Sequence, residues 1–181
     1  MLSSKKLKSL QKYIDIIEAN KGKTIGNIYK NIVGKNHAHF KKGASGLIIE
    51  NLLGLENNAS PKADLKELKV EIKVLPLQLH NLKVKEPTQI KMINFMEVAR
   101  ETWETAKIRD KIETIFWIVY GVPRDEETKK NLGQENYVII DWLLMYLMVK
   151  NKLFSRRIGS GFNHILFVEM VINYHARWEH I

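Results

Sequence analysis

The amino-acid sequence predicts an α/β fold built around a central sheet. Two observations support this prediction. Apolar residues recur at helical spacings in the N-terminal third of the chain, while residues 70–74 alternate between β-branched and charged side chains and residues 114–120 are almost wholly aromatic or β-branched. Since helical and strand patterns follow one another along the chain, we expect helices and strands to pack as layers of one domain.

Three helices are predicted before the first strand. The first covers residues 5–19, where leucine and isoleucine recur at spacings of three and four. The second begins after Thr24, a good N-cap residue, and ends at Gly34. The third spans residues 46–53 and ends at Gly54, because glycine readily takes the left-handed conformation that follows a helix.

Three strands are predicted in the middle of the chain. The first runs from Leu68 to Leu75 and is closed by Pro76, which lacks an N–H group. The second candidate is Thr88–Phe95. The third is Thr114–Tyr120, whose uninterrupted apolar character indicates a strand buried on both faces.

Two further helices are predicted, over residues 97–112 and 139–150. The second of these would carry an apolar stripe at helical spacing. The stripe consists of Trp142, Met145, Tyr146 and Val149. Residues 153–181 have no clear periodicity, and no element is assigned to them.

The composition bounds the class of protein. The 181 residues suit one domain, and the apolar content of 45% is too high for a disordered chain. Cysteine is absent, which excludes disulfides and fits a cytoplasmic protein. No apolar stretch is long enough to span a bilayer, so we expect no membrane partner. The formal charge of +9 favours a polyanionic partner such as nucleic acid, although a generally lysine-rich composition would also explain it.

The first predicted strand carries the most informative side chains. Glu71 and Lys73 are two residues apart and alternate with β-branched residues, so they should share the face opposite the core. Asp64 lies seven residues upstream of Glu71, close enough to occupy a neighbouring turn or strand. Two carboxylates and a lysine on a rigid sheet can bind a divalent cation and activate a water molecule.

Two observations weigh on this hypothesis. The sequence contains three Glu-x-Lys triplets, so chance and a solvated strand face explain such a triplet about as well as a catalytic site. Glu50 lies in an otherwise apolar helix, where a buried charge needs a partner or a metal. It could instead lie at the exposed edge of that helix, beside Asn51.

Several blocks in the same order resemble the MutH family of DNA endonucleases, which includes GATC-cutting restriction enzymes. The spacings from Glu50 to Asp64, Glu71 and Lys73 agree with the family pattern. The resemblance spans roughly residues 20–150. The matching blocks are Lys42-Gly-Ala-Ser-Gly46-Leu-Ile-Ile-Glu50, Leu53-Gly54, Ser60-Pro61-Lys-Ala-Asp64, Leu68-Lys-Val-Glu71-Ile-Lys73, Lys85-Glu86, Ile90-Lys-Met-Ile-Asn94-Phe95, Thr102-Trp103-Glu104-Thr105, Lys111, Phe116-Trp117-Ile-Val-Tyr120 and Asp141-Trp142.

The resemblance implies a PD-(D/E)xK restriction-endonuclease-like fold, with a central mixed sheet flanked by helices. It also implies Mg²⁺-dependent hydrolysis of phosphodiester bonds in double-stranded DNA. Asp64 and Glu71 would bind the metal, Lys73 would act on the attacking water, and Glu50 would be an additional catalytic carboxylate. Lys42 would lie near the scissile phosphate as both a catalytic and a DNA-binding residue. Lys111 is a further candidate for phosphate contact.

The chain departs from the family pattern in two places. Leu65 and Lys69 stand where the family often has an aromatic residue and a glycine. After about Lys152 the family's recognition segment has no counterpart, although Arg156 and Arg157 could still contact DNA phosphates. An inactive DNA-binding remnant is therefore one reading of the chain.

We accordingly expect one nuclease domain over residues 1–181. It would comprise an N-terminal helix (1–22), a catalytic core (23–152) and a tail (153–181) whose mismatch to the family pattern would fit a truncation. The block from Lys85 to Phe95 favours a type II restriction-like enzyme that cuts at GATC. A nicking endonuclease of mismatch repair is the alternative. A palindromic target calls for a homodimer or a second domain, whereas a repair enzyme would need a mismatch-repair partner protein.

Overall fold

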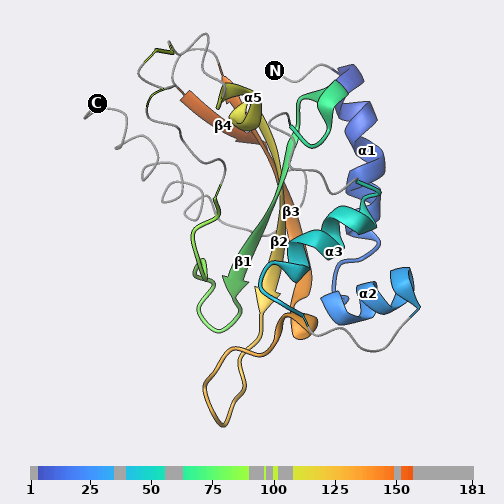
Figure 1. Ribbon diagram of the computed structural model, residues 1–181, viewed down its shortest axis with the longest axis vertical. Coiled ribbons are helices and arrows are strands. Elements are labelled where there is room, and N and C mark those ends of the chain that lie inside the picture. Colours follow the sequence, from blue (N-terminus) through green and yellow to red (C-terminus); the bar gives the residue numbers. More distant parts are fainter. Residues whose placement is uncertain are drawn as a thin grey trace.

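A four-stranded mixed sheet forms the centre of the protein, as the resemblance implied (Figure 1). The computed structural model describes residues 4–34, 40–55, 63–89, 96, 100–101, 108–148 and 152–156. The strands occur in the order β1-β2-β3-β4; β1 and β2 are parallel, and the other two pairings are antiparallel. Their bounds are β1 Glu71–Gln78, β2 Thr114–Val122, β3 Val138–Met148 and β4 Lys152–Arg156.

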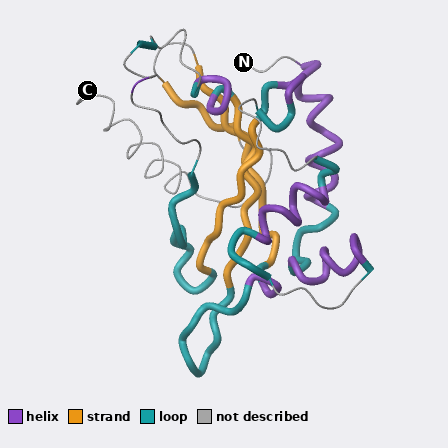
Figure 2. The backbone as a smooth tube through the Cα atoms, viewed as in Figure 1, coloured by secondary structure: helices purple, strands orange, loops and turns teal. Residues whose placement is uncertain are grey.

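Three helices, α1 (Ser4–Glu18), α2 (Ile25–Val33) and α3 (Ala44–Leu52), lie along one side of this sheet (Figure 2). All three were predicted. The side chain of Thr24 accepts a hydrogen bond from the N–H of Asn27 at 3.2 Å, which caps α2 as expected. These helices cover the sheet because packing their apolar faces against it removes that apolar surface from water.

The core between helices and sheet is continuous. Leu10 and Ile17 of α1, which are fully buried, pack in the same cluster as Phe116 and Ile118 of β2. The indole N–H of Trp142 donates to Glu18 at 2.6 Å, so the end of α1 is also tied to β3 by a hydrogen bond. The N-terminal helix is thus an integral part of the packed core.

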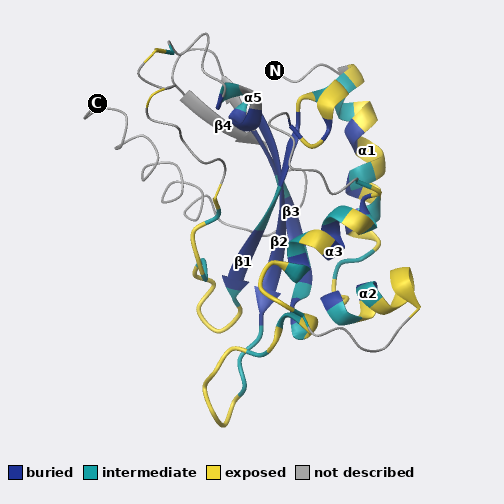
Figure 3. Ribbon diagram, in the orientation of Figure 1, coloured by how far each residue is buried: buried dark blue, intermediate teal, exposed yellow. Residues whose placement is uncertain are grey.

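The opposite face of the sheet has its own apolar cluster. It is formed by Leu75 and Leu77 of β1, Trp117 of β2, Met145 of β3, and residues of the short helix α5 (Arg109–Ile112). Every residue of β2 is buried (Figure 3). The predicted burial of Thr114–Tyr120 on both faces is therefore confirmed.

The predicted helix over residues 139–150 is wrong, because Val138–Met148 forms the strand β3. Trp142 and Met145, which the helical pattern assigned to one stripe, belong to clusters on opposite faces of the sheet. A strand covered on both faces shows no alternation. The pattern is further disturbed by a register shift, since Val119 pairs with Asp141 while Tyr120 pairs with Ile139.

The first strand also differs from its predicted bounds. Residues 66–68 form a turn of 3₁₀-helix, and β1 begins at Glu71 and continues through Pro76 to Gln78. Proline is tolerated here because β1 is the outer strand of the described sheet. The carbonyl of Pro76 accepts a hydrogen bond from the N–H of Lys85 at 2.8 Å, so the following loop folds back along this edge.

Some predicted elements lie outside the described residues. Most of the candidate strand 88–95, most of the predicted helix 97–112 and residues 157–181 are among them. Within the described part of the chain, no helix has the length and apolar character needed to cross a membrane.

Lys69, two residues before the start of β1, adopts a left-handed backbone with φ of 49°. A residue with a Cβ pays about 1 kcal/mol for this conformation. We predict that Lys69→Gly raises the free energy of unfolding by up to about 1 kcal/mol, because glycine adopts it without that penalty. Urea denaturation monitored by circular dichroism would measure the change.

Lys66, an exposed residue of the 3₁₀ turn, provides the matched control. Lys66→Gly should lower stability, because there glycine only adds conformational freedom to the unfolded chain. Equal destabilisation by both substitutions would contradict the claim that the left-handed backbone of Lys69 is strained.

Candidate active site

A tight turn brings Asp64 to the start of β1. Leu65 and Val70 pair with each other across this turn through hydrogen bonds of 2.9 and 3.3 Å. The chain therefore reverses within five residues, and Oδ2 of Asp64 accepts a hydrogen bond from the N–H of Ile72 at 2.8 Å. This hydrogen bond anchors one carboxylate oxygen of Asp64 to the strand. The residue as a whole remains exposed to solvent.

Glu71 is the buried centre of the site, with only 1% of its surface exposed. Its Oε1 lies 2.8 Å from Nζ of Lys73 and accepts a hydrogen bond from Nζ of Lys111 at 3.1 Å. A buried carboxylate requires such compensation. The alternative explanation of the Glu71–Lys73 pair, a solvated strand face, is excluded by this burial.

The second oxygen of Glu71 is less well satisfied. Nζ of Lys111 lies 3.0 Å from Oε2, but within the described residues this oxygen has no hydrogen-bond partner of acceptable geometry. The contact with Lys111 is thus electrostatic without being directional. A buried oxygen with unused lone pairs can coordinate a cation.

The parallel pairing of β1 and β2 explains the position of Lys111. Glu71 is opposite Ile115 in this pairing, so the residues just before Ile115 lie beside the start of β1. Lys111 belongs to α5, which ends two residues before β2 begins. The sequence did not reveal this ion pair, because strand register cannot be deduced from one strand alone.

Glu50 joins the same group of side chains from α3. Burial is the main cause that raises the pKa of Glu50 above its ordinary value, and the charge of Asp64 raises it further. Lys73 lowers the pKa of Glu50, while Glu71 raises it. Glu50 thus interacts electrostatically with the residues at the start of β1, and its role beside a metal stays a prediction.

The candidate site consists of five charged side chains, those of Glu50, Asp64, Glu71, Lys73 and Lys111. When all are ionised they carry three negative and two positive charges, which leaves a net charge of −1. Their carboxylate oxygens are the hard ligands that Mg²⁺ prefers. Among the described residues, no three histidine or acidic side chains are close enough to bind one ion together. The arrangement still fits Mg²⁺, which is commonly held by one or two carboxylates together with water and substrate oxygens. The unused oxygen of Glu71 could be one such ligand.

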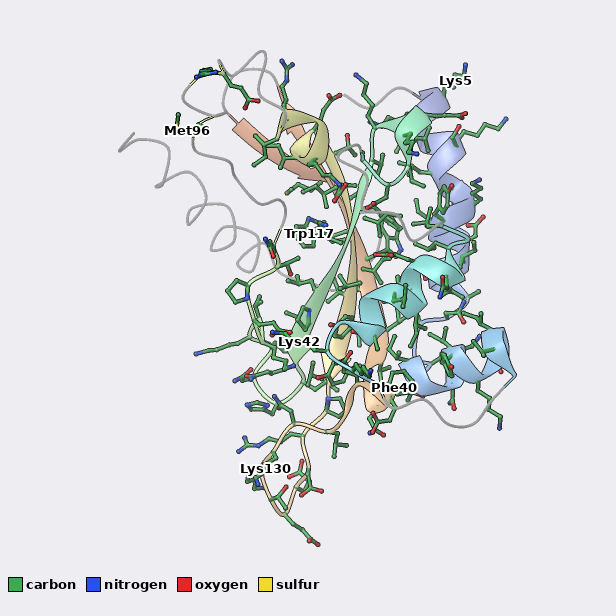
Figure 4. The ribbon with its side chains drawn as sticks, in the orientation of Figure 1. Lys5, Phe40, Lys42, Met96, Trp117 and Lys130 are labelled. Atoms are coloured by element: carbon green, nitrogen blue, oxygen red, sulfur yellow. The ribbon has the colours of Figure 1, made fainter. Side chains whose placement is uncertain are left out.

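Four lysine and arginine residues were predicted to contact DNA: Lys42, Lys111, Arg156 and Arg157. Lys42 is exposed just before α3 (Figure 4), whereas Glu50 is near the other end of that helix. The helical rise separates the two backbone positions by about 10 Å along the axis. Arg156 is the last residue of β4, and Arg157 lies outside the described residues. Lys111 is not an exposed surface lysine, because it is buried against Glu71.

A model of the family described as "DNA mismatch repair enzyme MutH" matches residues 53–151, more than half of the chain. The chain belongs to the MutH family. The matched segment contains Asp64, Glu71, Lys73 and Lys111, and it also contains strands β1 to β3. Glu50 and Lys42 precede it, so their place in the site depends on the geometry of α3 and on the resemblance of the Lys42–Glu50 block.

Curated relatives are consistent with membership of the MutH family. The chain is 29% identical over 94 residues to the DNA mismatch repair protein MutH of Actinobacillus pleuropneumoniae serotype 5b, an alignment covering 51% of the chain and 41% of that relative. It is 32% identical over 84 residues to MutH of Shewanella woodyi, which covers 46% and 36%. For MutH of Haemophilus influenzae strain 86-028NP the identity is 27% over 133 residues, covering 66% and 59%. The chain thus spans well under two thirds of the first two relatives.

The raised pKa of Glu50 predicts a pH-dependent loss of stability. The native state binds the Glu50 proton more tightly than the unfolded state does, so stability falls as the pH rises from about 4.5 through the native pKa. We predict that Glu50→Gln is more stable than the unchanged protein at pH 7, by about 0.5–1 kcal/mol for a half-exposed charge. At pH 4 the difference should nearly vanish.

Urea denaturation at both pH values, in the presence of EDTA, would measure this difference. Glu67→Gln is the control, because Glu67 is exposed in the turn before β1. An equal effect of Glu50→Gln at pH 4 and pH 7 would show that the native structure does not raise the pKa of Glu50.

Proposed function

We propose that this protein is a Mg²⁺-dependent endonuclease that hydrolyses phosphodiester bonds in double-stranded DNA. The observation that carries the proposal is the buried carboxylate of Glu71, which has a lysine on the same strand and an incompletely satisfied oxygen. Membership of the MutH family supports the same reaction. A buried charge of this kind is costly to fold, so a role in function accounts for its retention.

Asp64 and Glu71 would hold the metal. When bound there, Mg²⁺ would polarise the phosphate and lower the pKa of a water ligand. Asp64 is suited to this role because the hydrogen bond from Ile72 fixes one of its oxygens. Glu71 is suited because its neighbours in β1 and β2 fix its backbone.

Lys73 would orient the attacking water as an ammonium group whose charge stabilises the pentacoordinate phosphorus, or it would first lose its own proton and then accept one from the water. The 2.8 Å contact with Glu71 restrains its ammonium group beside the carboxylate, so little reorganisation is needed during the reaction. Glu50 would be a further carboxylate that orients water. Its raised pKa makes it a better proton acceptor than an ordinary glutamate.

DNA would be bound mainly through its phosphates. Lys42 would lie near the scissile phosphate, and Arg156 and Arg157 are candidates for contacts further along the backbone. The formal charge of +9 supports such binding through counterion release. A DNA substrate also fits the cytoplasmic location expected from the cysteine-free composition.

Two modes of cleavage are distinguished within this proposal. The relatives named for DNA mismatch repair favour nicking of one strand, in concert with a repair partner protein. The resemblance of the block from Lys85 to Phe95 to the restriction branch favours cleavage of both strands at GATC, which requires a homodimer or a second domain to supply two sites.

We predict that the protein cuts supercoiled plasmid containing GATC sites only when Mg²⁺ is added. Glu71→Ala should reduce the rate by at least about 100-fold, as expected for loss of a principal electrostatic group in a catalytic site. Gel electrophoresis of the plasmid would follow the reaction. Nicked circles on hemimethylated DNA would indicate repair-type cleavage, and linear products would indicate restriction-type cleavage.

Glu67→Ala is the matched control, because Glu67 belongs to a Glu-x-Lys triplet four residues upstream and is exposed. It should cut at the unchanged rate. Absence of Mg²⁺-dependent cutting by the unchanged protein, with DNA binding retained, would favour the inactive DNA-binding remnant.

A further inference from the structure

Lys111 contacts both carboxylate oxygens of Glu71, which a lysine that served only to bind a DNA phosphate would not need to do. Its Nζ lies 3.1 Å from Oε1 and 3.0 Å from Oε2, so its ammonium group spans both oxygens of the carboxylate. Only 11% of its side chain is exposed. An ammonium in this position has the carboxylate oxygens, rather than solvent, as its main electrostatic partner.

Lys73 and Lys111 contribute differently to this arrangement. Lys73 lies on the same strand as Glu71, contacts Oε1 and has 22% of its side chain exposed. Lys111 comes from another element and lies 3.0 Å from Oε2, the oxygen without a hydrogen-bond partner among the described residues. A divalent cation that binds Oε2 must therefore approach the ammonium of Lys111 or displace it.

We propose that Lys111 is a built-in counterion that competes with the divalent metal for Glu71 and thereby sets the metal affinity of the site. This inference rests on the proposed function of Glu71 as a metal ligand. The two ammonium groups already share Oε1 of Glu71. A divalent ion on Oε2 would place a doubled positive charge beside the ammonium of Lys111, and the two would repel each other strongly in a partly desolvated site. Metal binding should accordingly move Lys111 away from Oε2, where it becomes available to another anion such as a DNA phosphate.

The competition has a consequence for stability. When metal is scarce, Lys111 compensates the buried charge of Glu71 and so keeps the start of β1 folded. When Lys111 is removed, that charge depends more heavily on the metal. Stability and metal binding should therefore change in opposite directions in a Lys111 variant.

The test uses the full chain and the variant Lys111→Met, which keeps most of the side-chain volume and removes the charge. Isothermal titration calorimetry with Mn²⁺, in the absence of DNA, should give a dissociation constant about tenfold lower than that of the unchanged protein, a ratio typical of coupled binding. Thermal denaturation in EDTA should show a lower Tm. Saturating Mn²⁺ should raise the Tm of Lys111→Met by more than it raises that of the unchanged protein.

Lys66→Met controls for the loss of one positive charge near the site, because Lys66 is exposed in the turn before β1. It should leave both the metal affinity and the Tm increment unchanged. If Lys111→Met is unfolded in EDTA, the proposal requires that Mn²⁺ restore its far-ultraviolet circular dichroism.

The outcomes separate this inference from the proposed function. Equal or weaker Mn²⁺ binding by Lys111→Met, or no refolding by Mn²⁺, would overturn the inference alone if the unchanged protein binds Mn²⁺ and Glu71→Ala does not. Weaker DNA binding with unchanged metal affinity would make Lys111 a simple phosphate contact. Absence of Mn²⁺ binding by the unchanged protein would overturn both proposals.

Discussion

The buried charge of Glu71 is the constraint on which the rest of the site depends. A carboxylate with 1% of its surface exposed must be compensated, and here two lysines from different elements supply the positive charge. Lys111 reaches it only because β1 and β2 are parallel with Glu71 opposite Ile115. The pairing of the edge strand β1 with β2 is thus coupled to the electrostatics of the candidate active site.

The surrounding architecture keeps this charge in place. The helices α1 to α3 cover one face of the sheet, and α5 lies against the other, so β2 is buried along its whole length. Glu71 is buried at the start of β1, and Asp64, which precedes the strand, is exposed to solvent. The candidate site therefore lies at the boundary between the apolar core and the solvent. A carboxylate pair at such a boundary combines a desolvated oxygen with access for water and substrate, which is what a hydrolytic site requires.

Sequence patterns predicted those parts of the fold that depend on interactions between residues close together in the chain. The three N-terminal helices follow from apolar spacing and caps, and the β1 alternation correctly separated Ile72 from Glu71 and Lys73. The pattern of residues 139–150 failed, because β3 is apolar on both faces and its register shift breaks the period. The grouping of Glu50 and Asp64 with Glu71 was anticipated from spacing and resemblance. The ion pair of Lys111 was not, since it depends on a contact between residues 40 positions apart.

The most direct test of the central claim is a crystal structure of the protein grown with Mn²⁺, with the ion located by its anomalous scattering. The account predicts one anomalous peak between the carboxylates of Asp64 and Glu71, with Lys111 no longer in contact with Oε2 of Glu71. A protein that retains both lysines on Glu71 and shows no anomalous peak at these carboxylates would contradict the account.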